Sequence, residues 1–260
     1  MSTKIEWAEE SWNPIQMKCT KVSDGCKNCY ALKMLPRLQA IGHYPKDLSE
    51  PVLVDSVLEK PSHWRKPRRV FVESMGDLFH ESVPDKMILA IFMAIARSRG
   101  KGHTFMILTK RPLRMKSLID KWINDGVTFH EGCTGRLPSN LWLGVTAENQ
   151  EQADKRIPIL LKTPAAKLFV SIEPMLEYVD LGNYLCDTWI RGGLTMGRYL
   201  DWVIVGCESG QGRRRAQQQW FTMLTGMSET PLFIKQMEVD GKLVKMPEVM
   251  GKVWDQIPES

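Results

Sequence analysis

The feature that most constrains the fold of this chain is a unit of strand, polar loop and helix that recurs along the sequence. Its first copy comprises a buried strand at residues 69–74, a turn, and an apolar helix at residues 84–99. Later copies place strands at residues 104–108, 141–145, 167–171, 202–206 and 231–235, with helices opening near residues 112, 149 and 217. Strands that alternate with helices form parallel sheets with right-handed crossovers. The pattern predicts an α/β fold, a complete or partial β/α barrel of six or seven parallel strands, with a doubly wound open sheet as the alternative.

Three cysteines, Cys19, Cys26 and Cys29, lie in a polar loop before this repeat with the spacing C-x6-C-x2-C. Residues 5–15 are a candidate first strand before the loop, and residues 30–41 predict a helix after it. Three thiolates on one loop can hold a four-iron cluster and leave one iron open to a ligand that is not protein. A closed Cys3His zinc site, completed by His43, is the alternative. The loop by itself favours neither metal.

Composition sets the class of protein and the environment of the cysteines. With 260 residues, 43% of them hydrophobic, we expect a single domain over residues 1–260, with a cluster loop at 12–31 and an insertion at about 176–200. No run of eighteen apolar residues occurs, so we expect a soluble, cytoplasmic protein without a membrane anchor. In that compartment metal ligation is more common than disulfide formation. We expect the remaining cysteines to be packing residues, namely Cys133, Cys186 and Cys207.

Polar residues follow each predicted strand, at the edge where the loops of a parallel sheet gather. Each polar residue could be explained as a helix cap or a surface ion pair. Polar residues at the ends of six strands, all on the same edge of the sheet, favour a binding site. The rim comprises Glu73, Ser74, Gly76, Asp77, Thr109, Lys110, Thr146, Glu148, Asn149, Ser171, Glu173, Gly206, Glu208, Ser209, Lys235 and Gln236.

The cysteine loop and this rim together resemble a phage-associated family of the radical S-adenosylmethionine superfamily. The motifs that carry the resemblance cover most of the chain: Trp12-Asn13-Pro14, residues 19–31, 74–79, 108–112, 142–149, 171–174, 206–210 and 234–236. The loop departs from the commoner spacing C-x3-C-x2-C, and the aromatic Tyr30 follows the last cysteine instead of preceding it.

The resemblance implies an enzyme with a [4Fe-4S] cluster on the three cysteines and S-adenosyl-L-methionine on the open iron. Reductive cleavage would yield a 5′-deoxyadenosyl radical that abstracts hydrogen from the substrate, with the electron supplied by a donor such as a flavodoxin or ferredoxin. It also implies cofactor contacts from Tyr30, Met75, Gly76, Asp77, Glu148, Ser171, Gly206 and Glu208, and catalytic roles for Lys110 and Glu173.

The basic residues suggest an anionic substrate. The net charge is only +5, but positive residues cluster at 65–69, 110–111 and 213–215. We expect Arg213, Arg214 and Lys235 to bind substrate, with a nucleic-acid base or a modified nucleotide in phage DNA as the candidate. Trp7, Trp12 and Trp64 are candidate stacking surfaces. The alternative function is a zinc-stabilised nucleic-acid-binding protein without catalysis.

Overall fold

The computed structural model describes residues 5–129, 134–185, 198–226 and 229–259. Its centre is an eight-stranded, mostly parallel sheet that curls into a half-barrel. In spatial order the strands are β1 (Glu10–Trp12), β4 (Arg69–Val72), β5 (Thr104–Thr109), β6 (Leu141–Thr146), β7 (Lys167–Ile172), β8 (Trp202–Gly206), β9 (Leu232–Val239) and β10 (Lys242–Lys245). All neighbours are parallel except β9 and β10. The predicted α/β class is confirmed, and the sequence missed the antiparallel edge strand β10.

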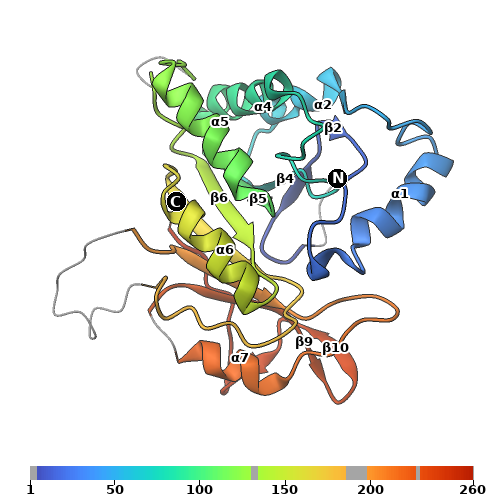
Figure 1. Ribbon diagram of the computed structural model, residues 1–260, viewed down its shortest axis with the longest axis vertical. Coiled ribbons are helices and arrows are strands. Elements are labelled where there is room, and N and C mark those ends of the chain that lie inside the picture. Colours follow the sequence, from blue (N-terminus) through green and yellow to red (C-terminus); the bar gives the residue numbers. More distant parts are fainter. Residues whose placement is uncertain (1–4, 130–133, 186–197, 227–228, 260) are drawn as a thin grey trace.

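The connecting helices pack against one face of this sheet (Figure 1). They are α4 (Asp85–Arg97), α5 (Pro112–Asn124), α6 (Gln150–Leu161) and α7 (Gln218–Thr225). Asn149 is the N-cap of α6, and its side-chain Oδ1 accepts a hydrogen bond from the Gln152 N–H. α1 (Tyr30–Ala40) follows the cysteine loop and contains Pro36.

Short elements complete the described chain. A two-stranded ladder of β2 (Ile15–Gln16) and β3 (Val52–Leu53) lies beside the first strand, followed by α2 (Asp55–Leu58) and α3 (Lys60–His63). A second ladder joins β11 (Glu248–Val249) and β12 (Lys252–Val253). The 3-10 helices are η1 (Asp24–Cys26) and η2 (Arg99–Lys101). Within the described residues, no helix has the length and apolar character needed to cross a membrane.

The other face of the sheet is filled by aromatic side chains. Trp202 contacts the rings of Trp7, Trp142 and Phe233 at centroid distances of 6.0–6.2 Å. Gly144 makes room for this packing, because a Cβ there would lie 2.5 Å from the ring of Phe169. Side chains thus close the interior of the half-barrel below its carboxyl edge.

This packing corrects one expectation about the tryptophans. Trp7 and Trp12 are 2% and 1% exposed, so neither is available to stack on a base. Trp64 is partly buried and packs edge-on against His103, with the guanidinium of Arg68 over its ring. Cys207 is buried, as expected of a packing cysteine, whereas Cys133 and Cys186 lie outside the described residues. Residues 186–197 of the expected insertion at 176–200 lie outside them too.

Candidate functional site

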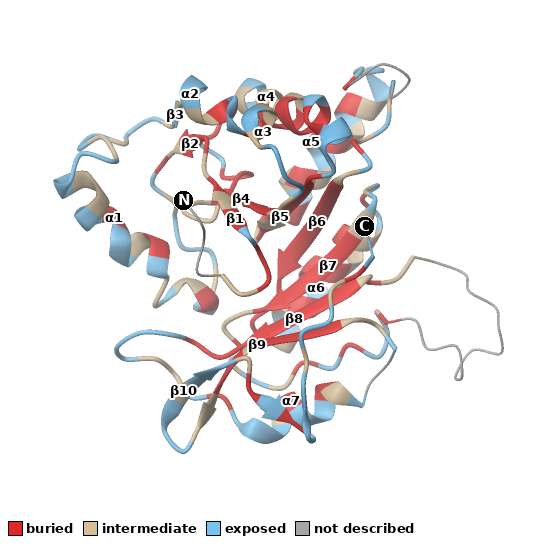
Figure 2. Cartoon of the chain, turned by 180° about the vertical axis from the view of Figure 1, so that it is seen from behind, coloured by how far each residue is buried: buried red, intermediate tan, exposed pale blue. Residues whose placement is uncertain are grey.

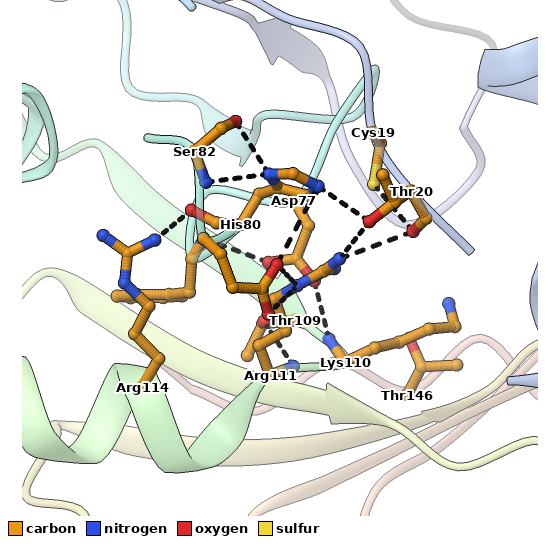
Figure 3. A network of polar contacts seen from close by, with 12 residues as sticks. Cys19, Thr20, Asp77, His80, Ser82, Thr109, Lys110, Arg111, Arg114 and Thr146 are labelled. Carbon is orange, nitrogen blue, oxygen red and sulfur yellow. Dashed lines mark hydrogen bonds and ion pairs between the residues drawn. The ribbon is translucent and has the colours of Figure 1, made fainter. Parts of the chain in front are cut away.

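The cysteine loop is docked on the carboxyl ends of the parallel strands by a buried ion pair. Asp77, after β4, and Arg111, after β5, pair at 3.0 Å with side chains only 8% and 6% exposed. Asp77 also accepts hydrogen bonds from the Thr109 hydroxyl at 2.7 Å and from the Lys110 backbone N–H at 3.0 Å. Figure 3 shows these groups converging on one carboxylate. Four donors therefore satisfy Asp77, since the Phe79 N–H contributes as well.

Arg111 extends this network to the cysteine loop. Its Nη2 donates to the hydroxyl of Thr20 at 3.0 Å, and its Nε contacts Glu81 at 2.9 Å. Thr20 is the residue after Cys19, and its hydroxyl also lies 2.8 Å from Nε2 of His80. Burial lowers the pKa of His80, so its ring is neutral at physiological pH. The start of the loop is thus fixed to two strand ends by one guanidinium.

A second buried pair holds the middle of the loop. Glu148, after β6, is fully buried and pairs with Arg156 of α6 at 2.9 Å. Its other oxygen accepts a hydrogen bond from the backbone N–H of Gly25 at 3.2 Å. Gly25 is required there, because a Cβ would lie 2.9 Å from the Glu148 carboxyl carbon. Burial alone would raise the pKa of Glu148, but the charges of Arg156 and Lys110 and nearby hydrogen bonds together outweigh it and the pKa is lowered.

A third pair holds the end of the loop. Glu208, after β8, pairs with Arg214 and accepts a hydrogen bond from the Asn28 side-chain amide at 2.8 Å. Asn28 lies between Cys26 and Cys29 and also donates to the Gly212 carbonyl. Burial would raise the pKa of Glu208, but the hydrogen bonds from Arg214 and Asn28 lower it to about 2. Glu208 is therefore a carboxylate at any physiological pH.

The turn after β4 contacts the loop through smaller groups. The hydroxyl of Tyr30 donates to the Ser74 carbonyl, and the Met75 N–H donates to the Asn13 side chain at 3.2 Å. Gly76 lies against Met17, whose sulfur would be 2.8 Å from a Cβ at that position. Close approach at Gly76 was expected, and the neighbour observed there is the segment leading into the loop.

Rim residues on β7, β8 and β9, together with Glu173 directly after β7, form a separate cluster. Glu173 pairs with Lys235 at 3.0 Å, and the Ser171 hydroxyl donates to Glu173 at 3.3 Å. Gly206 faces this carboxylate, since a Cβ there would lie 2.6 Å from Oε1 of Glu173. Burial would lower the pKa of Lys235, but Glu173 outweighs it and the pKa is raised. Lys235 and Glu173 thus form a charged pair, with their side chains 22% and 15% exposed.

The arginines expected to bind an anion are partly neutralised. Arg213 and Arg215 both pair with Glu238 of β9, at 3.1 Å and 3.4 Å, and Arg214 pairs with Glu208. Arg213, Arg215 and Glu238, with Gly212, line an open hollow. Arg215 is 85% exposed, so it is the member of this group best placed to meet an anion in solution.

The three thiols are free and lie within mutual electrostatic range. Burial, followed by the charge of Asp77, raises the pKa of Cys19 to about 11, and Arg111 opposes that shift. Among the residues that the structure describes, no group of three or more Cys, His, Asp or Glu side chains is arranged to hold a metal ion. Metal binding by the loop would therefore require the thiols to converge and Cys19 to lose its proton.

The carboxylates of this site were predicted from the sequence, but several of the residues that pair with them were missed. Arg111, Arg156 and Asn28 were not expected there, although each completes a contact to the loop. A signal existed for Arg111, which follows Lys110 in a basic pair at the end of a predicted strand. The contact with Asp77 uses the backbone N–H of Lys110, and its ammonium is not engaged there.

One buried carboxyl of the rim has an unused oxygen. Glu73, directly after β4, is 2% exposed and adopts a left-handed backbone with φ of 55°. Its Oε1 accepts a hydrogen bond from the Ile15 N–H at 2.7 Å, but Oε2 has no hydrogen-bond partner within the described residues. Burial raises the pKa of Glu73 from its ordinary value of 4.5 to about 8. The side chain is therefore largely protonated at neutral pH.

A family model described as "Protein of unknown function (DUF5131)" matches residues 2–258 of the chain. No curated protein and no solved structure matches it.

We expect Arg111→Ala to destabilise the protein and release the cysteine loop. Removing one partner of a buried ion pair costs about 3–5 kcal/mol, because the other charge stays buried. Urea unfolding should show this loss, and Cys19 should react faster with a thiol reagent in native buffer. Arg97→Ala is the control, since Arg97 pairs with Glu59 on the surface and such pairs contribute about 0–1 kcal/mol. Equal effects of the two substitutions would contradict the assignment.

We expect Glu73→Gln to weaken the pH dependence of stability. The native state holds the Glu73 proton up to pH about 8, whereas the unfolded chain releases it near 4.5. The contribution of this group to the free energy of unfolding is therefore complete below pH 4.5 and is lost as pH rises through 8. At about 1.4 kcal/mol per pKa unit, the loss is a few kcal/mol.

Urea unfolding at pH 5, 6.5 and 8 measures this effect. The decrease between pH 5 and pH 8 should be smaller in Glu73→Gln than in the unsubstituted protein. The exposed Glu151 provides the control substitution Glu151→Gln, which should leave the profile unchanged. Parallel profiles for all three proteins would show that Glu73 titrates as an ordinary carboxyl.

Proposed function

We propose, from the premise that the chain belongs to the DUF5131 family, that this protein is a radical S-adenosylmethionine enzyme with a [4Fe-4S] cluster on Cys19, Cys26 and Cys29. The observation that carries the proposal is the docking of the cysteine loop across the carboxyl ends of β4, β5, β6 and β8. Ligands of parallel α/β sheets bind at this edge. The proposed cluster would then lie at the mouth of the half-barrel.

The donor set suits a cluster with an open iron. Three thiols on one short loop match a four-iron cluster that leaves one position for S-adenosylmethionine. With both groups bound, the cofactor would supply a 5′-deoxyadenosyl radical for hydrogen abstraction. The residues of the chain would hold the loop, orient the ligands and exclude water.

The contacts of the rim divide the proposed roles among its residues. Asp77, Glu148 and Glu208 are engaged with arginines and the loop, so we assign them to positioning the cysteines. This leaves Lys110 and the cluster of Ser171, Glu173 and Lys235 to contact cofactor or substrate. A cofactor lying against Gly206 would have to displace the Glu173 carboxylate, which now occupies that space.

In the alternative, a zinc-stabilised protein without catalysis, the expected fourth ligand His43 does not lie beside the cysteine loop. Cys29 precedes the first residue of α1, and His43 lies beyond its last turn. Eleven helical residues at 1.5 Å each separate the two ends by about 16 Å. Zinc–nitrogen bonds are about 2 Å long, so His43 would have to move far to complete a Cys3His shell.

For the substrate we retain a nucleic-acid base or modified nucleotide, such as one in phage DNA. Support comes from the exposed Arg215 in the loop after β8 and from the charged pair of Lys235 and Glu173. The buried tryptophans give no support to base stacking. We place the enzyme in the cytoplasm, with a flavodoxin or ferredoxin as electron donor.

We expect anaerobically reconstituted protein to be brown, with about four irons and four sulfides per chain, and to cleave S-adenosylmethionine when reduced with dithionite. Cys19→Ala, Cys26→Ala and Cys29→Ala should each lose the cluster. Cys207→Ala is the control and should retain it, because Cys207 is a buried residue directly after β8 and is not one of the three loop cysteines. Stoichiometric zinc without sulfide would refute the proposal.

We expect single-stranded DNA to bind with an affinity that depends on Arg213 and Arg215. Log affinity should fall with log salt by about 0.7 per phosphate neutralised, and Arg213→Ala with Arg215→Ala should flatten that slope. Lys86→Ala with Lys162→Ala removes the same charge elsewhere and should leave the slope unchanged. Absence of binding at low salt would point to a peptide or a free metabolite as the substrate.

A further inference from the structure

The cysteine loop and α1 expose positive charge that the described chain does not neutralise. Residues 18–41 contain five basic side chains and one acidic side chain, Asp24. All five basic residues are exposed, and none forms an ion pair with any other residue that the structure describes: Lys18, Lys21, Lys27, Lys33 and Arg37. The arginines at 213–215, by contrast, all pair with Glu208 or Glu238. The uncompensated charge thus surrounds the cysteines.

Apolar side chains are exposed on the same segment. Tyr30, Met34 and Ile41 are 47%, 44% and 61% exposed. At about 100° per helical residue they lie within about 40° of one another around α1, and Lys33 and Arg37 border them. Figure 2 shows α1 at the edge of the molecule, away from the sheet. We call residues 18–41 the loop–α1 face.

The composition of this face favours a protein partner over nucleic acid. Protein interfaces combine an apolar centre with a polar rim, and methionine is enriched in them. Single-stranded nucleic acid is bound on aromatic side chains, and here the only exposed aromatic is Tyr30, whose hydroxyl is engaged by Ser74. Five unpaired cations select a partner with an acidic surface.

We infer that the loop–α1 face is the docking site of an acidic electron-carrier protein. This inference rests on the proposed function, because the electron needs an acceptor held by the cysteines. In the transfer, the reduced flavin or iron–sulfur centre of the carrier loses one electron and the acceptor on the loop gains it. The loop that holds the acceptor forms part of the docking surface, so the carrier's centre can approach it closely.

The test measures the binding of oxidised flavodoxin to the full chain across a salt series. The oxidised form is used so that binding is measured without electron transfer. Lys33→Glu with Arg37→Glu should weaken binding at least about tenfold, and Met34→Asp should weaken it as well. Lys86→Glu with Lys162→Glu introduces the same charge change on exposed lysines elsewhere, which form no ion pair with any residue that the structure describes, and should change affinity less than about twofold. Binding should also weaken with salt.

The outcomes separate this inference from the proposed function. Three results would overturn the docking site: unchanged flavodoxin binding in both double variants, equal loss of binding in both, or no binding to the unsubstituted protein at low salt. Each would do so even if the dithionite-reduced protein cleaves S-adenosylmethionine. Selective loss of single-stranded DNA binding in Lys33→Glu with Arg37→Glu, with flavodoxin unaffected, would reassign the face to nucleic acid. Selective loss of flavodoxin binding supports the docking surface, and a missing cluster would then refute the enzymatic proposal and the electron transfer, but not the surface itself.

Discussion

The ion pair of Asp77 and Arg111 is the contact on which the position of the cysteine loop depends. It is buried on both sides, and the same guanidinium reaches Thr20, next to Cys19. A buried ion pair contributes little net stability compared with apolar packing, but it is costly to break and is directional. It can therefore fix the register of a loop that has little regular structure of its own, η1 being three residues long.

The same arrangement occurs three times along the rim. In each, a carboxylate at a strand end pairs with an arginine. Either the carboxylate accepts a hydrogen bond from the cysteine loop, or the arginine donates one to the loop. The three sets are Asp77 with Arg111 and Thr20, Glu148 with Arg156 and Gly25, and Glu208 with Arg214 and Asn28. Because the contacts are spread over the start, middle and end of the loop, each cysteine lies within three residues of a fixed point. Rim carboxylates are thus used to position the loop before any ligand is bound.

The strands and helices could be predicted from the sequence because the spacing of apolar residues depends on which side chains are buried. The runs at 69–74, 104–108 and 202–206 became β4, β5 and β8, and Asn149 caps α6 as its side chain suggested. The rim carboxylates could be located for the same reason, since they end these strands. Their pairing could not, because Arg156 reaches Glu148 through tertiary packing that no local period encodes, and Arg214, which was expected in the site as a substrate ligand, instead pairs with Glu208. β10 was missed because its residues are mostly exposed, so no alternation of burial marks it.

The most basic segment of the sequence is not the one most available to bind an anion. The distribution of paired and unpaired basic side chains explains why. Arg213, Arg214 and Arg215 are adjacent in sequence, yet each is opposed by a carboxylate, and Arg214 is needed to hold Glu208 and the loop. The lysines of residues 18–41 are spread along the sequence and form no ion pair within the described chain. An anionic partner gains most from charges that are not already compensated, since neutralising them displaces only water and counterions. Charge runs in a sequence therefore locate anion-binding surfaces only after the acidic residues folded against them are known.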